Sequence, residues 1–233
     1  MKQCINISLY LTFGVFFLHS CFNAAKDLSE KLSEGEVTYK ISYNQDVESH
    51  SMSFVYPKEM TLYFKDNKQR LSFKGGLGLY AFDFIFGGEH DTVYTLLKIN
   101  LFEKKYFVPT INKNLLIFPE ISEEIITTLI DETKEIAGLT VKKATVKFAD
   151  DDNFNVSIWY SDNFRISSPN KNTPFHEVPG VPLESEVVFK NVTFSYKAHK
   201  INPKTINDDV FTVPDDFVQI TLEEMEDLLG TVF

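Results

Sequence analysis

Alternation of apolar and polar side chains is the sequence feature that most limits the fold of this chain. Residues 37–43 and 60–65 carry an apolar side chain at every second position, and the second run ends at the turn-forming pair Asp66 and Asn67. A period of two is typical of strands with one buried face, whereas helices show a period of about 3.6. Asp and Asn favour tight turns because their side chains bond to nearby backbone groups. This part of the chain therefore predicts antiparallel strands joined by short turns.

Further strand-like segments follow at intervals of about ten residues, a spacing typical of all-β domains. Residues 125–130 are ambiguous, since Ser122 could cap a helix there, but the run is mostly β-branched and favours a strand. Residues 150–153 predict a hairpin loop. We therefore expect a mainly β fold: a single curved antiparallel sheet or incomplete β-barrel with a short C-terminal helix. The other predicted strands are residues 71–73, 93–99, 104–108, 115–118, 141–148, 154–160, 184–190 and 193–199.

The C-terminal helix is predicted from its capping residues and its apolar spacing. Thr221 and Glu224 form a capping box, in which each residue bonds to the other's backbone N–H. Gly230 favours an end of the helix at that position. The apolar residues that would share one face of this helix are Leu222, Met225, Leu228 and Leu229.

The N-terminus resembles a bacterial lipoprotein signal. Lys2 is followed by an apolar run and then by Cys21, the residue that would be acylated. We therefore expect a signal peptide over residues 1–20, a lipidated N-terminus and tether over 21–34, and one β-rich domain over 35–233. Two alternatives stay open, because the segment from Gln3 has no charged side chain as far as residue 25. They are a cleaved secretion signal without lipid and an uncleaved membrane anchor.

Cysteine usage and charge exclude several classes of chemistry. The two cysteines, Cys4 and Cys21, both fall in the N-terminal segment, so an acylated Cys21 leaves the body without thiols, disulfides or Cys-based zinc sites. The chain carries 33 acidic and 23 basic side chains, a formal net charge of −10 at pH 7. An acidic surface repels polyanions, so we expect no nucleic-acid partner. No histidine spacing or nucleophile motif indicates a metal site or catalysis, so we predict a non-catalytic protein without cofactor or metal.

An aromatic stripe is the main candidate for a ligand-binding surface. Tyr80, Phe82, Phe84 and Phe86 would lie on one face of a strand, with Asp83 on the opposite face. The stripe has two interpretations. It lines an apolar cavity that binds a ligand, or it belongs to a packed core.

Four motifs resemble the GLPGLI family of bacterial envelope proteins. Residues 131–144 (DETKEIAGLTVKKA) resemble the family's "ETK-I-G-x-x-x-x-KA" strand, and residues 158–161 (IWYS) resemble its "WY-T" strand. Residues 173–175 (TPF) then lead to 178–183 (VPGVPL), at the position of the Gly-Leu-Pro-Gly-Leu-Ile signature. The residues that match the family loop are Thr173, Pro174, Phe175, Pro179, Gly180, Pro182 and Leu183.

The resemblance implies a fold and a class of ligand. The family is similar, more loosely, to the lipoprotein-carrier (LolA/LolB-like) architecture, a curved antiparallel sheet wrapped part-way around helices with an apolar cavity. Independently of the family, Pro179 and Gly180 suit the centre of a type II turn, with Gly180 at positive φ. Pro182 disfavours pairing in a central strand. We therefore expect a rigid loop before a strand that starts at Leu183.

The sequence as a whole favours a lipid-anchored protein of the cell envelope, at the outer membrane and either periplasmic or surface-exposed. We predict that it contacts the membrane through its N-terminal lipid and binds a lipid or other apolar ligand in a β-lined cavity. The alternative is an accessory or scaffold lipoprotein that docks to an outer-membrane complex through a sheet edge. The protein partner is unidentified by the sequence.

Overall fold

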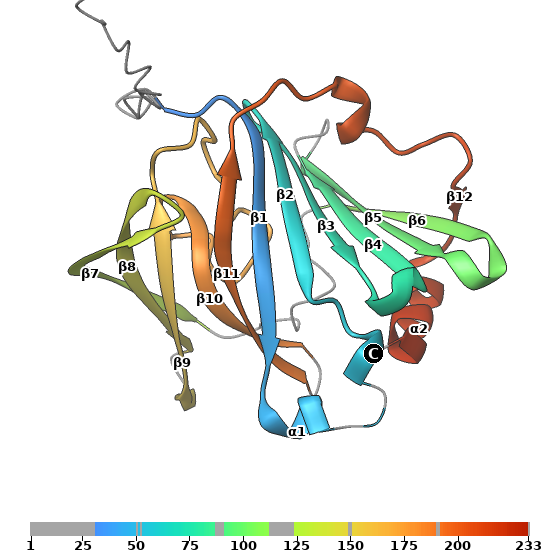
Figure 1. The fold of residues 1–233 in the computed structure, drawn as a ribbon, viewed down its shortest axis with the longest axis horizontal. Helices are drawn as coiled ribbons and strands as arrows, with labels where there is room; N and C mark the ends of the chain where they lie inside the picture. Colours follow the sequence, from blue (N-terminus) through green and yellow to red (C-terminus); the bar gives the residue numbers. More distant parts are fainter. Residues whose placement is uncertain are drawn as a thin grey trace, which may run out of the picture.

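One twelve-stranded sheet organises the chain. The computed structural model describes residues 31–49, 51, 53–86, 91–111, 124–148, 151–189 and 192–232. The strand order is β12-β6-β5-β4-β3-β2-β1-β11-β10-β9-β8-β7, and the curved sheet stays open (Figure 1). The strands are β1 (Glu34–Tyr43), β2 (Glu59–Lys65), β3 (Lys68–Lys74), β4 (Tyr80–Phe86), β5 (Thr92–Ile99), β6 (Lys104–Ile111), β7 (Ile125–Ile136), β8 (Leu139–Phe148), β9 (Asp151–Ser161), β10 (Val181–Phe189), β11 (Val192–Asn202) and β12 (Val218–Gln219). The predicted mainly β fold is confirmed.

Helical elements are few and short. They are α1 (Gln45–Ser49), η1 (Ser53–Val55), η2 (Gly76–Gly78), η4 (Asn100–Phe102), η5 (Asp208–Phe211) and α2 (Leu222–Val232). The predicted signal (1–20), Cys21, the tether up to residue 30 and the predicted strand 115–118 lie outside the described residues.

Two-residue turns join neighbouring strands because their residues accept positive φ. Asp66 (φ 51) opens the predicted turn between β2 and β3, and Ala137 (φ 49) and Gly138 (φ 83) join β7 to β8. Ala137 and Gly138 both have positive φ, so the β7–β8 turn is of type I′, whose twist matches that of the flanking strands. Residues 125–130 form a strand, as expected, within the longer β7.

Two sequence predictions are corrected by the strand and helix boundaries. Asp151 begins β9, so the predicted loop 150–153 is shorter than expected. Helix α2 does not end at Gly230 but continues to Val232. The predicted capping box at its start does form, since the Glu224 N–H donates to Thr221 Oγ1 at 3.2 Å. The last short strand, β12, pairs with β6 in parallel.

The main core covers one face of the sheet, here called the inner face. It includes Val37, Phe64 and Phe84, all fully buried, and Met225 and Leu229 from α2 pack against it. Leu32, which lies in the predicted tether, is buried here too and pairs with Phe164. The chain is therefore fixed to the sheet from Leu32 onward.

A C-terminal strap, residues 203–217, covers the outer face of β3 to β6. Ile206 and Phe211 of the strap pack on Ile85 and Leu96, whose side chains point away from the inner face. Polar contacts hold the strap in place: Arg70 Nη1 donates to the Val210 carbonyl at 3.0 Å. Ile85 and Leu96 are therefore buried on the outer face as well.

A buried ion pair beneath the strap gives a test of this packing. Arg70 Nη2 lies 2.9 Å from Asp83 Oδ2, and the two side chains are 19% and 10% exposed. The other Asp83 oxygen has no hydrogen-bond partner among the described residues. We expect Arg70→Ala to lower the free energy of unfolding by about 3 kcal/mol, because it leaves a buried carboxylate without its partner.

Urea unfolding measures this loss, with Lys68→Ala as the control. Lys68 also contacts the strap, through Asp208, but both side chains are about half exposed. Its loss should therefore cost less than about 1 kcal/mol. Equal losses for the two variants would contradict the assignment of the buried pair.

Candidate functional site

The loop 162–180 between β9 and β10 builds the candidate site by packing onto the inner face of the sheet. Phe175 and Val178 of this loop are buried in a separate apolar cluster with Ile158 and Tyr160 from β9 and Val146 from β8. Phe175 and Val178, which belong to the segments that resemble the family motifs, therefore act first as packing residues. Their burial fixes the loop above the sheet.

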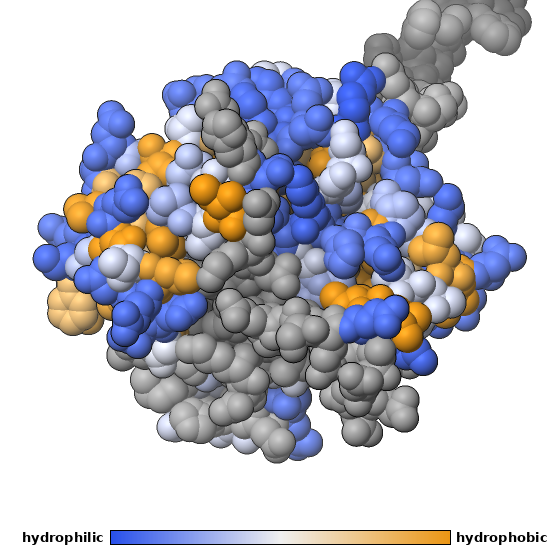
Figure 2. Space-filling view, turned by 180° about the vertical axis from the view of Figure 1, so that it is seen from behind, coloured by the Kyte–Doolittle hydropathy of each residue, from blue (hydrophilic) through white to orange (hydrophobic). Residues whose placement is uncertain are grey.

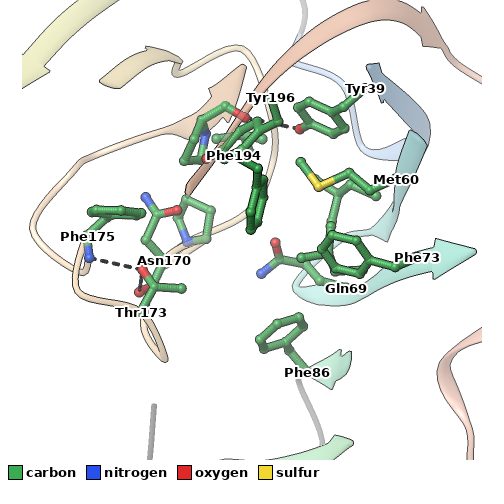
Figure 3. A pocket seen from close by; sticks show the side chains of 15 residues that line it. Tyr39, Met60, Gln69, Phe73, Phe86, Asn170, Thr173, Phe175, Phe194 and Tyr196 are labelled. Atoms are coloured by element: carbon green, nitrogen blue, oxygen red, sulfur yellow. Dashed lines mark hydrogen bonds between the residues drawn. The ribbon is translucent and has the colours of Figure 1, made fainter. Parts of the chain in front are cut away.

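A small apolar pocket lies between this loop and the sheet, with a volume of about 90 Å³. Figure 3 shows Phe194, Met60 and Phe73 from three strands directed toward the space opposite Asn170 and Thr173 of the loop. The residues that line it are Tyr39, Met60, Leu62, Gln69, Leu71, Phe73, Phe86, Pro169, Asn170, Thr173, Phe175, Val181, Pro182, Phe194 and Tyr196.

Two tyrosines make one wall of the pocket rigid. The Tyr39 and Tyr196 rings meet edge to face with centroids 5.6 Å apart. Tyr39 Oη donates to the Pro182 carbonyl at 3.1 Å, which ties β1 to the start of β10. Burial raises the pKa of both phenols above the usual value, so they stay protonated at neutral pH. This wall therefore carries no charge.

A polar hollow of about 200 Å³ adjoins the apolar pocket and shares Gln69, Phe86 and Pro169 with it. Lys171 lies in an ion pair with Asp91 there, at 2.6 Å. The two hollows together present an apolar lining next to a polar lining. Such a combination suits a molecule with an apolar end and a polar group.

Asn170 holds the loop in its conformation. Its buried side-chain amide donates to the carbonyls of Val178 and Gly180, both at 2.9 Å. Thr173 Oγ1 in turn donates to the Asn170 carbonyl at 2.9 Å and accepts the Phe175 N–H at 3.0 Å. These local bonds satisfy polar groups that the loop buries.

The signature-like loop differs from its prediction in two respects. Gly180 is absent from the residues with positive φ, so the predicted type II geometry is wrong. A Cβ at Gly180 would lie 2.4 Å from the Ser161 carbonyl oxygen, so glycine is needed for close approach. Pro182 lies within β10 and pairs with Tyr160, beside a register shift before Glu184 that accommodates it.

The matched loop residues divide between pocket and core. Thr173, Phe175 and Pro182 line the pocket. Pro174 is buried, Pro179 is exposed, and Leu183 is fully buried in the main core.

The aromatic stripe lies mainly in the core. Tyr80, Phe82 and Phe84 are 5%, 3% and 0% exposed. Phe82 stacks on Phe73 with centroids 4.5 Å apart. Of the four residues proposed as a cavity wall, Phe86 alone is among those that line the pocket. Tyr80, Phe82 and Phe84 therefore belong to a packed core rather than to the wall of a cavity.

Sequence reasoning missed most of the pocket. Gln69 is 6% exposed and occupies an inward position two residues before Leu71 in β3. A polar residue in an otherwise apolar alternation was a usable signal for it. Asn170 and Met60 carried no such signal. They line the same pocket because the loop 162–180 packs onto strands that are distant from it in sequence.

Within the described part of the chain, no three His, Cys, Asp or Glu side chains gather closely enough to hold a metal ion. No helix there has the length and apolar character needed to cross a membrane.

Comparisons with known proteins add little to the geometry. No protein-family model and no curated protein sequence matches the chain. Among solved structures, the crystal structure of MucB is similar with a TM-score of 0.30 and 10% sequence identity, over 82% of this chain and 59% of that one. This chain thus spans less than two thirds of that structure's length. The GLPGLI resemblance stays a prediction from motifs.

The role of Asn170 can be tested by proteolysis. Asn170→Asp keeps the side-chain size but removes both donors, so we expect the loop to loosen and trypsin to cleave after Lys171 about tenfold faster. His176→Ala is the matched control, because His176 is an exposed residue of the same loop. Unchanged cleavage after Asn170→Asp would contradict the assigned role.

Proposed function

We propose that this chain is a non-catalytic, membrane-anchored protein of the cell envelope that binds the apolar end of an amphipathic ligand between the loop 162–180 and the sheet. The adjoining apolar and polar hollows, which share Gln69, Phe86 and Pro169, carry the proposal. A lipid or another molecule with an apolar end has the matching chemistry.

Pocket size limits the part of the ligand that is bound. Pockets for drug-sized ligands usually measure roughly 300–1,000 Å³. A volume of about 90 Å³ is well below that range. It suits the end of an alkyl chain or a single ring rather than a whole acyl chain. The polar group would lie in the adjoining hollow, near Lys171 and Asp91.

The first described residues lie beside the start of the loop that covers the pocket. The Leu32 N–H donates to the Asn163 carbonyl at 2.7 Å, and the Arg165 N–H donates to the Leu32 carbonyl at 2.7 Å. The chain thus joins the sheet at the beginning of the loop that covers the pocket. Ten residues separate Cys21 from Leu32, a stretch that reaches at most about 35 Å. An anchored chain would therefore keep its pocket within reach of membrane molecules.

Methionine NMR on the full-length chain tests ligand binding. The chain has four methionines, of which Met60 lines the pocket and Met225 is fully buried elsewhere in the core. With ¹³C-methyl labelling and a series of n-alkanols as probes, we expect the Met60 signal to shift and the Met225 signal to stay. Each added CH₂ should tighten binding about fourfold until the pocket is full.

Two Leu→Trp variants make the assignment specific. Leu71→Trp fills the pocket and should abolish the Met60 shift, whereas Leu129→Trp, on exposed β7, should preserve it. A stationary Met60 signal across the whole series, in a folded chain, would contradict ligand binding.

Anchoring is tested separately by metabolic labelling with an alkyne analogue of palmitate. The proposed signal predicts label on the unmodified chain and on Cys4→Ser, and none on Cys21→Ser. Each variant replaces the sulfur of one cysteine by oxygen, so Cys4→Ser is the matched control for Cys21→Ser. Label that persists in Cys21→Ser would contradict acylation at this residue.

Docking to a protein complex is the second candidate function, and one observation favours it. Strand β7 ends the sheet and pairs, among the described strands, with β8 alone. It exposes Ile126 (39%) and Leu129 (58%) beside this unpaired edge. An extended segment of a partner can add to such an edge through backbone hydrogen bonds.

A further inference from the structure

Gln69 of β3 is a polar side chain buried on the inner face of the sheet. It is 6% exposed and lines both the apolar pocket and the polar hollow beside it. Its neighbours in register are Phe64 on β2 and Phe86 on β4, and neither side chain offers an amide a conventional hydrogen bond. Figure 3 shows the Gln69 amide directed toward the space that faces Asn170 and Thr173 of the loop. The sheet therefore presents a buried amide to the pocket.

The other polar side chains that line the apolar pocket already bond within the protein. Tyr39 Oη, Asn170 Nδ2 and Thr173 Oγ1 each donate to a backbone carbonyl. Tyr196 is hydrogen-bonded to a serine side chain. The Gln69 amide differs from them, because it has no hydrogen-bond partner among the residues that the structure describes. Its donor and its acceptor are therefore available to a bound molecule.

An unpaired amide at this position does not serve folding. Removing an amide from water without giving it a partner destabilises the folded state. Leu71 and Phe73 occupy the next two inward positions of β3 and show what the alternation favours there. A leucine at position 69 would continue this pattern and leave no polar group unpaired. The fold therefore gains nothing from glutamine here, which indicates a role in binding.

The lining of the two hollows carries no net charge. Lys171 and Asp91 are the charged side chains among the described residues that line them, and they pair with each other at 2.6 Å. Both are 53% exposed, so the pair faces solvent. A charged group placed beside Gln69 would lose its water without gaining a free counter-charge. The lining therefore favours a ligand whose polar group is uncharged.

The described outer surface does not make this selection. Figure 2 shows apolar patches between hydrophilic ones across the described part of the back of the molecule. Such a mixed surface is ordinary for a folded domain and does not distinguish one amphiphile from another. Recognition of the polar group therefore depends on side chains inside the pocket.

We propose that Gln69 recognises an uncharged amide group next to the apolar end of the ligand, an inference that rests on the proposed function of the pocket. The glutamine side chain offers a donor and an acceptor on neighbouring atoms, and an amide offers the complementary pair. A ketone matches only the donor, and a hydroxyl oxygen reaches only one of the two at good angles. The ligand class is thus an amphiphile that carries an amide directly after its alkyl chain.

Two probes of equal shape test this recognition on the full-length chain. Hexanamide and 2-heptanone carry the same alkyl chain, but the ketone has a methyl group in place of the amide nitrogen. Their affinities are measured from the ¹³C-methyl signal of Met60, which lines the pocket. We expect Gln69→Leu to weaken hexanamide binding about tenfold and to change 2-heptanone binding less than about threefold, because the lost amide pairing matters most for the first probe.

Three controls accompany these titrations. Gln219→Leu makes the same change at an exposed position of β12 and should leave both affinities unchanged. Hexanoate and hexylammonium should bind the unmodified chain at least about tenfold more weakly than hexanamide, because they lack a free counter-charge in the lining. Without ligand, Gln69→Leu should raise Tm by about 3 °C, because it removes the unpaired amide.

The outcomes separate this inference from the proposed function. If both probes bind and Gln69→Leu changes them equally, the pocket binds apolar molecules but the role of Gln69 is wrong. A Tm that falls in Gln69→Leu would show that the amide has a structural partner, such as an ordered water, and would also overturn the inference. A Met60 signal that stays in place with every probe, n-alkanols included, would remove the proposed function and this inference with it.

Discussion

Two hydrogen bonds from the buried Asn170 amide underlie the site, because they hold the loop 162–180 in the shape that encloses the pocket. The carbonyls that accept them belong to Val178 and Gly180, which lie directly before β10. With the loop closed in this way, Phe175 packs against the β8–β9 apolar cluster. Gly180 can then approach the backbone of Ser161. The pocket is thus a consequence of how one loop satisfies its own polar groups.

The sheet supplies a rigid base for this loop. Its outer face on β3 to β6 is covered by the strap, and its inner face carries the main core. The loop meets this base where the N-terminal segment also joins it, at Leu32 and Phe164. The N-terminal segment therefore joins the molecule at the start of the loop that covers the pocket.

The sequence predicts the sheet well because alternation is a local property. Residues 37–43 and 60–65 reveal their inner faces without reference to the rest of the chain, and Thr221 and Glu224 reveal the start of α2. Contacts between distant residues are not local. Nothing near Asn170 in sequence indicates its buried amide.

The same limit explains the errors. The aromatic stripe lies on one face of a strand, as the alternation predicts, but sequence alone does not say whether that face meets a cavity or other side chains. The sequence predicts a turn with positive φ at Gly180, because glycine often supplies it, whereas in the structure this glycine makes room for a neighbouring carbonyl. Pro182 enters a central strand because a register shift lies beside it.

The irregularity in β7 bears on how the free edge of the sheet can pair with other strands. The pairing of β7 with β8 shifts register between Ile130 and Thr133, which divides the free edge into two short stretches. A bulge of this kind twists an edge and interrupts the row of backbone donors and acceptors. Asp131 and Glu132 lie at the interruption and add negative charge. An incoming strand can therefore pair with only a few consecutive residues of β7. This opposes edge-to-edge association of copies of the chain into fibrils.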